Sequence, residues 1–365
     1  MIRIKSPGRI CLFGEHQDYL NYPVIAMAIS KYIYLEAERI PEKKFKISLP
    51  DINEHMEIQL KGGEIEYLSK RDYLRSGYNQ FIRKNLKFKN GYSIKITGEI
   101  PINAGAASSS ALVMAWLYFL NFILGCPFTK NELANMGYLT EVAEFGEAGG
   151  KMDFFTSIHG NVIYLEPKKQ NDYVLEFPLK LEGFVLGDSL EKKQTVDDLR
   201  RVKTLSLKSF EILQSIMPEF NEFKTSLKEI DTFLPNLEMK YQKKIIGNII
   251  NRDLTKQALE LINNFTSLKV RTSNDSINFH RKLGHLLNLH EKQLKEKIEI
   301  ITPKIDLLIR KCLEGGALGA KINGSGFGGT MFALSPGNEL LLKEIIEKNG
   351  GNAYSIKTSD GVENY

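Results

Sequence analysis

Cysteine is scarce in this chain, and the cysteines that occur are far apart. Cys11, Cys126 and Cys312 are the three among 365 residues, and none of them forms a CxxC pair. This scarcity excludes a small domain held together by disulfides, and it favours a reducing compartment. We expect no secretory leader, because three basic residues interrupt every apolar run in the first ten positions. The expected location is therefore the cytoplasm.

An excess of charge of one sign is also lacking. The 49 Lys and Arg residues and the 44 Asp and Glu residues leave a net charge of +5, which is spread along the chain. So small and dispersed an excess does not predict binding to nucleic acid, whereas it is compatible with anionic small molecules.

Long apolar runs are limited to one stretch, which reads ALVMAWLYFLNFILG at 111–125. It is shorter than the roughly 20 apolar residues that a membrane-spanning helix needs. Asn121 interrupts it, a serine triplet precedes it, and Pro127 follows soon after it. These features predict a buried core helix rather than a membrane anchor.

What the chain does have is length. A sequence of 365 residues, 42% of them hydrophobic, exceeds what one core usually organises. We therefore expect two domains, at 1–178 and 179–365. The composition and pattern of the sequence change near this boundary, because a helical pattern rich in Lys, Glu and Leu runs from 195 to about 313.

Strand-like patterns occupy both ends of the chain. Four short runs rich in branched and aromatic residues fill the first forty positions, and another such run covers 92–100. Two further strands are expected on either side of a glycine-rich turn at 322–332. In between, the apolar spacing after Glu132 predicts a helix that ends at Gly149 and Gly150.

A segment of small residues follows the strand at 92–100. It reads PINAGAASSSAL, from Pro101 to Leu112, and leads into the apolar helix. Small residues let backbone N–H groups approach an anion, and the following helix adds unpaired N–H groups and a positive dipole end. The segment therefore predicts a phosphate-binding loop, although neither GxxxxGK[ST] nor GxGxxG occurs in it. The serines at 108–110 can cap the helix, bind phosphate or hold a divalent cation, and a plain N-cap is the alternative.

The glycine-rich turn at 322–332 reads INGSGFGGTMF. Its glycines permit positive φ angles and a close approach of the backbone to a ligand. The turn can therefore cover a ligand, or it can simply close a tight hairpin.

Polar residues cluster just after the first apolar strand, in SPGRICLFGEHQDYLN. Arg9 lies at the start of this segment, and Glu15, His16 and Asp18 follow Gly14. Carboxylates and an imidazole together accept from and donate to several hydroxyls, which favours recognition of a polyol. A metal site and a solvated loop are the alternatives, and the second histidine of a HExxH metal site is missing.

Carboxylates recur in EVAEFGEAGGKMDFF. Asp153 lies between two apolar residues, an environment that suits a positioned general base. Glu141, Glu144 and Glu147 precede it at spacings that would place them on similar faces of a helix. A glutamate near a phosphate loop is a reasonable ligand for magnesium (Mg²⁺), and a solvated helix surface is the alternative for each of them.

Taken together and in this order, three segments resemble the motifs of the GHMP kinase superfamily. They are SPGRICLFGEHQDY, IPINAGAASSSAL and GAKINGSGFGG, and the first is most similar to the galactokinase signature. Residues 285–329 are also similar to the C-terminal region of galactokinases. The resemblance implies a two-domain α+β fold with ATP and a sugar in the cleft between the domains. It implies transfer of the γ-phosphoryl group of ATP to a sugar hydroxyl by a monomer or small homo-oligomer.

The resemblance also implies roles for individual residues. Asp153 would be the general base, and Arg9 would stabilise the transferring charge or lower the pKa of Asp153. The sugar would be held by Glu15, His16, Asp18 and Tyr19. ATP and its phosphates would be bound by Gly105, Ala106, Ala107, Ser108, Ser109, Ser110, Gly324 and Gly326. The Mg²⁺ ligands would be Ser109, Ser110 and Glu144, with Glu141 as the alternative glutamate.

Several positions depart from the galactokinase pattern. Lys151 and Phe154 flank the base where GIMDQ is usual, Gln17 replaces a threonine, and Asn103 and Ala104 replace glycines. Glu144 lies nine residues before the base, one fewer than expected. The departures leave the acceptor open: galactose phosphorylated at its anomeric 1-hydroxyl comes first, followed by a related hexose, amino sugar, uronic acid or pentose. A non-catalytic sensor of sugar and ATP, and a kinase for mevalonate or homoserine, are the competing interpretations.

Overall fold

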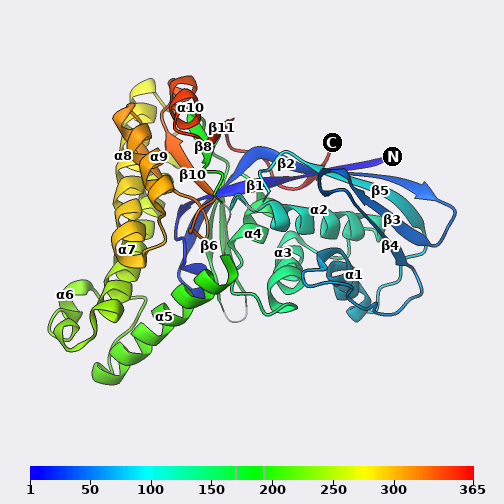
Figure 1. The fold of residues 1–365 in the computed structure, drawn as a ribbon, viewed down its shortest axis with the longest axis horizontal. Helices are drawn as coiled ribbons and strands as arrows, with labels where there is room; N and C mark the ends of the chain where they lie inside the picture. The colour runs from blue at the N-terminus through cyan, green and yellow to red at the C-terminus, as the bar shows by residue number, and fades with distance from the viewer. Residues whose placement is uncertain (103, 169–170, 192–194) are drawn as a thin grey trace.

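The computed structural model describes residues 1–102, 104–168, 171–191 and 195–365, so Asn103 of the small-residue segment lies outside the described residues. A large mixed sheet and a small sheet organise the chain (Figure 1). The large sheet has the order β12-β1-β2-β5-β3-β4, with β6 added beside β2 and β7 beside β6. Its strands are β1 (Ile2–Phe13), β2 (Val24–Ile40), β3 (Lys44–Leu49), β4 (Glu54–Gln59), β5 (Gly91–Gly98), β6 (Val162–Glu166), β7 (Tyr173–Phe177) and β12 (Glu363–Asn364).

The four short strands expected in the first forty residues are two long ones. β1 pairs with β2 along its length, and the register shifts between Pro7 and Arg9 and between Cys11 and Phe13. A side chain at Gly8 would place its Cβ 2.7 Å from the carbonyl oxygen of Ala106. The strand therefore continues through an irregularity that lets the loop before the apolar helix approach its backbone.

Four helices lie along one face of the large sheet (Figure 1): α1 (Tyr73–Arg83), α2 (Ser108–Ile123), α3 (Lys130–Tyr138) and α4 (Met152–His159). The prediction of a core helix after the serine triplet is confirmed, because ten of the 16 residues of α2 are buried, including Trp116. Among the helices of the described residues, none has the length and apolar character that crossing a membrane requires.

The helix expected to end at Gly149 ends earlier. After α3, the chain makes a π-helical turn at Leu139–Ala143 and then leaves the helix. A π turn takes in one more residue than an α-helical turn, so the side chains after it rotate away from the regular spacing. Glu141 and Glu144 consequently do not share a face, which bears directly on the site described below.

The small sheet has the order β11-β8-β10-β9, and all its strand pairs are antiparallel. Its strands are β8 (Phe184–Asp188), β9 (Gly319–Ile322), β10 (Thr330–Leu334) and β11 (Asn352–Ile356), and β9 and β10 confirm the predicted strand, turn and strand. Helices follow β8 as the sequence predicts. They are α5 (Thr195–Ile216), α6 (Leu227–Ile230), α7 (Met239–Thr266), α8 (Ser273–Gln293), a π-helical turn at Leu294–Ile298, α9 (Pro303–Glu314) and α10 (Glu339–Lys348).

The chain passes from the large sheet to the small one and then returns. β7 ends at Phe177 in the large sheet, and β8 begins at Phe184 in the small one. After β11, Glu363 and Asn364 pair with Lys5 and Ile4 on the edge of β1, so the two termini lie close together (Figure 1). The division into two domains at residue 178 stays a prediction. The segment after β11, which returns to the large sheet, would cross that boundary.

Candidate active site

Arg9 and Asp153 form an ion pair between β1 and α4. Nε and Nη2 of Arg9 donate to the two carboxylate oxygens of Asp153, at 2.7 and 2.8 Å. Arg9 is buried in β1, whereas the side chain of Asp153, in the first turn of α4, is 26% exposed. The pair was expected from residues 144 positions apart, and the structure brings them together.

The third donor of Arg9 reaches the small-residue loop. Its Nη1 donates to the carbonyl oxygen of Gly105 at 2.6 Å, and its backbone N–H donates to that of Ala106 at 3.1 Å. Burial opposes the positive charge of Arg9, but the carboxylate of Asp153 outweighs it and raises the pKa of the guanidinium. Arg9 therefore stays charged while it joins the carboxylate to the loop.

The loop itself has the conformation that an anion site needs. Gly105 and Ala107 have φ angles of +87° and +63°, and Ala107 precedes α2 without a side-chain acceptor for the amides of the helix N-terminus. From the small sheet, Asn323 Nδ2 donates to the carbonyl oxygen of Gly105 at 3.0 Å. A side chain at Gly324 would place its Cβ 2.8 Å from the same oxygen. The amides of α2 therefore face an opening whose rim comes from both sheets.

That opening is a cavity of about 740 Å³. Its walls include Arg9, Gly105, Ser108, Ser109, Glu141 and Asp153 from the region of the large sheet. From the other side of the cleft come Asp188, Leu190, Glu191 and Ser325, and α5 adds Leu199. The predicted cleft between the two parts of the chain thus has a polar wall on one side, at the N-terminus of α2.

Two smaller cavities adjoin it. One of about 150 Å³ shares Arg9 and Asp153 with the large cavity and is also lined by His16, Asp18, Tyr19, Gly150 and Gly324. The other, of about 180 Å³, is mainly apolar. It shares Tyr73, Ile102, Ser108 and Ser109 with the large cavity and adds Ile33, Leu49, Ile52, Ile96, Ile100 and Leu112. The Arg9–Asp153 pair therefore stands where a large cavity and a small one meet.

His16, Asp18 and Tyr19 are fixed by their own contacts at the small cavity. His16 Nε2 lies 3.0 Å from the carbonyl oxygen of Ser325, which can only accept, so Nε2 carries the proton. Nδ1 lies 2.8 Å from the hydroxyl of Tyr19, within hydrogen-bond distance. Asp18 accepts from the backbone N–H of Met152 at 3.3 Å, and burial raises the pKa of its carboxyl group. A side chain at Gly150 would collide with this carboxylate.

Glu15 has a different environment from its neighbours. Its side chain is fully buried and forms an ion pair with Lys321 of β9, which also donates to the carbonyl oxygen of Cys11 at 3.0 Å. His290 Nδ1 lies 3.6 Å from the same carboxylate, and burial holds the pKa of this imidazole well below its usual value. Lys321 thus occupies Oε1 of Glu15, whereas Oε2 is buried without a hydrogen-bond partner and Glu15 lines the small cavity, so its contact with a sugar hydroxyl stays a prediction.

The two candidate glutamates for the metal have different surroundings, and these favour Glu141 over Glu144. Glu144 receives two hydrogen bonds from Arg83, at 2.7 and 2.9 Å, and one from Tyr67 at 2.5 Å, which hold it away from the loop. Glu141 instead accepts from Ser109 Oγ at 2.6 Å. The π-helical turn at Leu139–Ala143 is the reason, since it rotates the two glutamates to different sides.

Glu141 is also the more perturbed carboxylate. Burial raises its pKa to about 7, although hydrogen bonds from Ser109 and Ser110 act in the other direction. Its Oε2 is buried without a hydrogen-bond partner. A buried carboxylate oxygen without a partner, next to a serine hydroxyl and a phosphate-binding loop, is a donor set that suits Mg²⁺. Among the described residues, no group of three or more His, Cys, Asp or Glu side chains is placed to hold a metal ion.

Gly326 lies away from the large and the small cavity, whereas Glu147 faces both of them. Gly326 lies against Ile300, where a Cβ would come within 2.6 Å of that side chain, and it lines neither the large nor the small cavity. Its predicted contact with phosphate is not supported. Glu147 lines both cavities and pairs with Arg71 at 2.5 Å.

Sequence reasoning missed Lys321, Asn323 and Leu199. A lysine between alanine and isoleucine in a strand expected to be buried was a signal that a carboxylate must lie opposite. Asn323, in the glycine-rich turn, gave a weaker signal, and Leu199 gave none, because its position depends on how α5 crosses the site.

Comparisons with known proteins agree with this architecture. The model described as "GHMP kinases N terminal domain" matches residues 72–161, and "GHMP kinases C terminal" matches 273–353. A third model, "Galactokinase galactose-binding signature", matches residues 2–39. The three models cover the phosphate-binding loop, the glycine-rich turn and the segment that carries Arg9 and Glu15.

Relatives of two kinds resemble the whole chain. Galactokinase of Thermotoga maritima is 29% identical over 99% of this chain and 99% of its own length. Mevalonate kinase of Pyrococcus furiosus is 28% identical over 95% of this chain and 92% of its own length. Among solved structures, galactokinase of Lactococcus lactis complexed with galactose superposes with a TM-score of 0.84 at 20% identity, covering 100% of this chain and 95% of that one. This last likeness shows a shared fold.

The fold, the loop before α2 and the three matching models lead to one conclusion. The chain belongs to the GHMP kinase superfamily, its first strands match the galactokinase galactose-binding signature, and it is an ATP-dependent phosphotransferase with an alcohol group as acceptor.

Proposed function

We propose that the chain is a sugar kinase that transfers the γ-phosphoryl group of ATP to a hydroxyl of a monosaccharide, with the anomeric hydroxyl of galactose as the first candidate. The observation that carries the proposal is the position of the Arg9–Asp153 pair. It lies where a cavity large enough for a nucleotide meets a cavity of about 150 Å³, the size of a single small acceptor. Phosphoryl transfer needs this juxtaposition of donor, base and acceptor more than it needs covalent chemistry.

The nucleotide is assigned to the large cavity. Its phosphates would lie against the backbone of residues 105–107 and the N-terminus of α2, and its base would enter the apolar cavity of about 180 Å³. Ser109 and Glu141 fit Mg²⁺ together with phosphate oxygens. When bound, the cation neutralises charge on the phosphates.

The acceptor is assigned to the small cavity. Its hydroxyl would approach Asp153, each of whose oxygens keeps a lone pair beyond the bond from Arg9. Asp153 takes the proton of the hydroxyl as the hydroxyl oxygen bonds to the γ-phosphorus and the bond to the leaving ADP breaks. The proton then passes from Asp153 to solvent. Arg9 keeps Asp153 oriented and places a positive charge beside the reacting phosphoryl group.

The lining of the small cavity favours a neutral polyol. His16, Asp18 and Tyr19 provide its polar side, whereas Val142, Met152, Phe154 and Leu199 provide an apolar side for C–H groups. Among the described residues that line it, Arg9 is the one basic side chain of Lys or Arg type, and it is already paired with Asp153. A carboxylate on the acceptor would therefore meet Asp18 and Asp153 without a free cation, which disfavours uronic acids and mevalonate.

The test is ADP release with ATP and Mg²⁺ over a panel of hexoses, amino sugars, pentoses, uronic acids, mevalonate and homoserine. We expect turnover with a neutral sugar, and a loss of about 10²- to 10⁴-fold in Asp153→Asn, because general base catalysis typically contributes that much. Asp360→Asn makes the same chemical change at an exposed ion pair with Lys180 and should retain full activity.

Two outcomes would overturn the proposal. Turnover on mevalonate or homoserine alone would make the chain a kinase for a non-sugar alcohol. Binding of both sugar and ATP without ADP release would favour a sensor built on the same fold.

A further inference from the structure

The segment that lines the small cavity has a second face. We define residues 14–22 as the acceptor segment. Its His16, Asp18 and Tyr19 line the cavity, whereas Gln17 and Tyr22 are fully buried in the opposite direction. Gln17 Nε2 donates to the backbone carbonyl oxygen of Asn248 in α7 at 2.8 Å. The acceptor segment is therefore held partly by helices of the second half of the chain.

Tyr22 makes the second of these contacts. Its hydroxyl donates to the carbonyl oxygen of Glu222 at 2.8 Å. Glu222 belongs to residues 217–226, the connection between α5 and α6. This connection is a stretch of turns, so its carbonyl groups need partners from outside.

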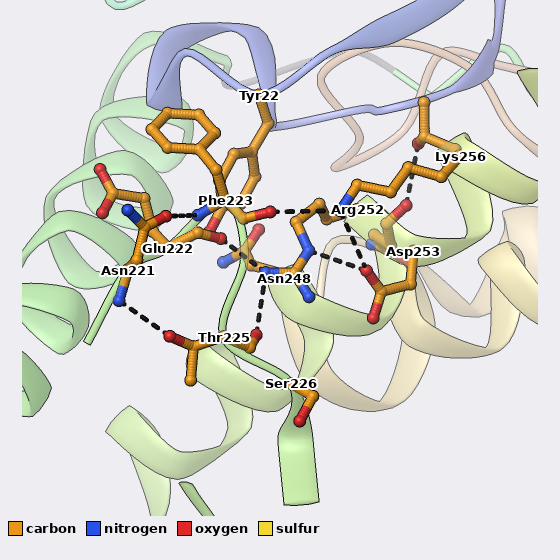
Figure 2. A network of polar contacts seen from close by, with 12 residues as sticks. Tyr22, Asn221, Glu222, Phe223, Thr225, Ser226, Asn248, Arg252, Asp253 and Lys256 are labelled. Carbon is orange, nitrogen blue, oxygen red and sulfur yellow. Dashed lines mark hydrogen bonds and ion pairs between the residues drawn. The ribbon is translucent and has the colours of Figure 1, made fainter. Parts of the chain in front are cut away.

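Arg252 supplies those partners (Figure 2). Its Nη1 donates to the carbonyl oxygens of Glu222 and Thr225 at 2.7 and 3.0 Å, and its Nε donates to Asp253 at 2.8 Å. Arg252 is 2% exposed, and burying a guanidinium is costly unless its donors are used. The oxygen of Glu222 thus accepts from both Tyr22 and Arg252, which joins the acceptor segment, the connection and α7 at one atom.

The connection is the continuation of α5, and α5 reaches the active site. Leu199 of α5 lines both the large and the small cavity. Lys203 Nζ lies 5.3 Å from the ring centre of Tyr19, and the ring of Phe210 lies 6.0 Å from that of Tyr22. One end of α5 therefore covers the site, and the other end leads into the carbonyl groups that Arg252 holds.

We propose that Tyr22 and Arg252 form an anchor that positions α5 and the acceptor segment relative to each other, and so sets the affinity for the acceptor without touching it. Both are positioning residues, which act through Leu199 and through Asp18 and Tyr19. The proposal rests on the assignment of the acceptor to the small cavity. It predicts a larger effect on the acceptor side than on the nucleotide side, because Tyr22 belongs to the acceptor segment itself, whereas the anchor reaches the nucleotide cavity only through Leu199.

The first experiment separates the two substrates. Arg252→Gln should raise KM for the acceptor about 10-fold, because the acceptor segment would be misplaced. It should leave KM for ATP within about two-fold, because the loop at 104–107 would keep its position. Arg252→Lys keeps the positive charge and can still donate to one or two of the oxygens that Arg252 binds. Its KM for the acceptor should therefore lie between those of Arg252→Gln and the wild type. Tyr22→Phe keeps the buried ring and removes only the hydroxyl, and it should raise the acceptor KM by a smaller factor. Because both residues act through Glu222, the double variant should show less than the product of the two effects.

The matched control is Lys256→Met. Lys256 is on the same helix and donates to the carbonyl oxygen of Phe223 in the same connection, at 3.1 Å, but it is exposed. Its removal should leave both KM values unchanged. Equal increases of both KM values in Arg252→Gln, or multiplicative effects in the double variant, would overturn the anchor.

A second measurement needs no substrate and therefore does not depend on the proposed function. Amide hydrogen exchange of Arg252→Gln should be faster in residues 14–22 and 197–216 and unchanged in residues 104–123. If the wild-type protein phosphorylates no sugar, the proposed function fails while this comparison still decides the anchor. Exchange that is unchanged, or faster throughout the protein, overturns the anchor even if sugar phosphorylation is demonstrated.

Discussion

The two halves of the proposed active site are built in different ways. The phosphate-binding part of the nucleotide half is one contiguous loop and the start of one helix, where backbone groups of residues 104–110 face the cavity, and Asp188, Leu190, Glu191 and Ser325 close the opposite side. The acceptor half is assembled from β1, the acceptor segment, β9, α5 and α7, and it is held by buried side chains. Backbone recognition can therefore be encoded by a short run of small residues, whereas side-chain recognition depends on partners that lie hundreds of positions away.

Arg9 connects the two halves by its hydrogen bonds. Arg9 binds the carboxylate of Asp153 with two donors and the carbonyl group of Gly105 with a third. Two kinds of variant test this contrast between the halves. One kind removes a contact that holds the acceptor half in place, and the other kind changes a residue whose effect should distinguish the two halves.

The largest expected effect is on the acceptor half and concerns stability. Lys321→Met leaves Glu15 buried without its partner, so we expect it to lower the free energy of unfolding by about 3–5 kcal/mol. Denaturant unfolding measures the change. The double variant Lys321→Met with Glu15→Gln leaves no buried charge and should recover much of the loss. A single variant as stable as the wild type would show that the ion pair does not hold the acceptor segment.

The next effect joins the halves. Arg9→Lys cannot bind both oxygens of Asp153 and reach Gly105, so kcat/KM should fall by about 10²- to 10³-fold for both substrates. Steady-state kinetics with each substrate varied in turn provides the measurement. Arg39→Lys, at an exposed arginine bound to Asn90, is the control. A loss restricted to one substrate would contradict the double role of Arg9.

A smaller effect probes the nucleotide half through pH. The pKa of Glu141 is about 7 in the folded chain and near 4.5 when unfolded, so between these values the folded state binds more protons. The stability that this group contributes is present at pH 4 and is lost as the pH rises through about 7. Glu141→Gln lacks this loss, and its stability relative to wild type should therefore increase by about 3 kcal/mol between pH 4 and pH 8.

Unfolding curves at the two pH values test this sign. A relative stability that is the same at both pH values would contradict the burial of a protonated Glu141. Added Mg²⁺ and ATP should reduce the difference at pH 8, because a cation favours the ionised carboxylate.

The smallest effect distinguishes the two glutamates. Hydrogen bonds from Arg83 lower the pKa of Glu144, so its contribution to stability is present above pH 4.5 and is lost as the pH falls through the lowered pKa. Glu144→Gln should cost at most about 1 kcal/mol at pH 7, because Arg83 is partly exposed and solvent screens the pair. The cost should shrink as the pH falls below 4.5 and through the lowered pKa, and ADP release should be unaffected. A loss of Mg²⁺-dependent activity in this variant would restore Glu144 as the metal ligand.

Much of the fold and of the nucleotide half could be predicted from the sequence. The loop at 101–112, the helix after it and the strands around the glycine-rich turn are local features, in which composition and spacing specify the backbone. Arg9 and Asp153 could be selected because each lies in a motif that resembles one family.

The remaining features depend on geometry that spacing does not contain. The π-helical turn at Leu139–Ala143 places Glu141 beside the loop and Glu144 away from it, and a regular helical period does not predict such a turn. The partner of Glu15 lies 306 positions away, in β9. The anchor at Arg252 depends on an irregular connection whose carbonyl groups carry no signal in the side-chain sequence.

The pairing of β12 with the edge of β1 affects how the chain is made. β1 is synthesised first, yet Ile4 and Lys5 on its outer edge find their strand partners only at Asn364 and Glu363. At a translation rate of about 5–20 residues per second, that edge stays open for roughly 20–70 s on the ribosome. An uncovered strand edge offers unpaired backbone groups to other nascent chains. Pairing with residues 363 and 364 covers this part of the edge once these residues have been made.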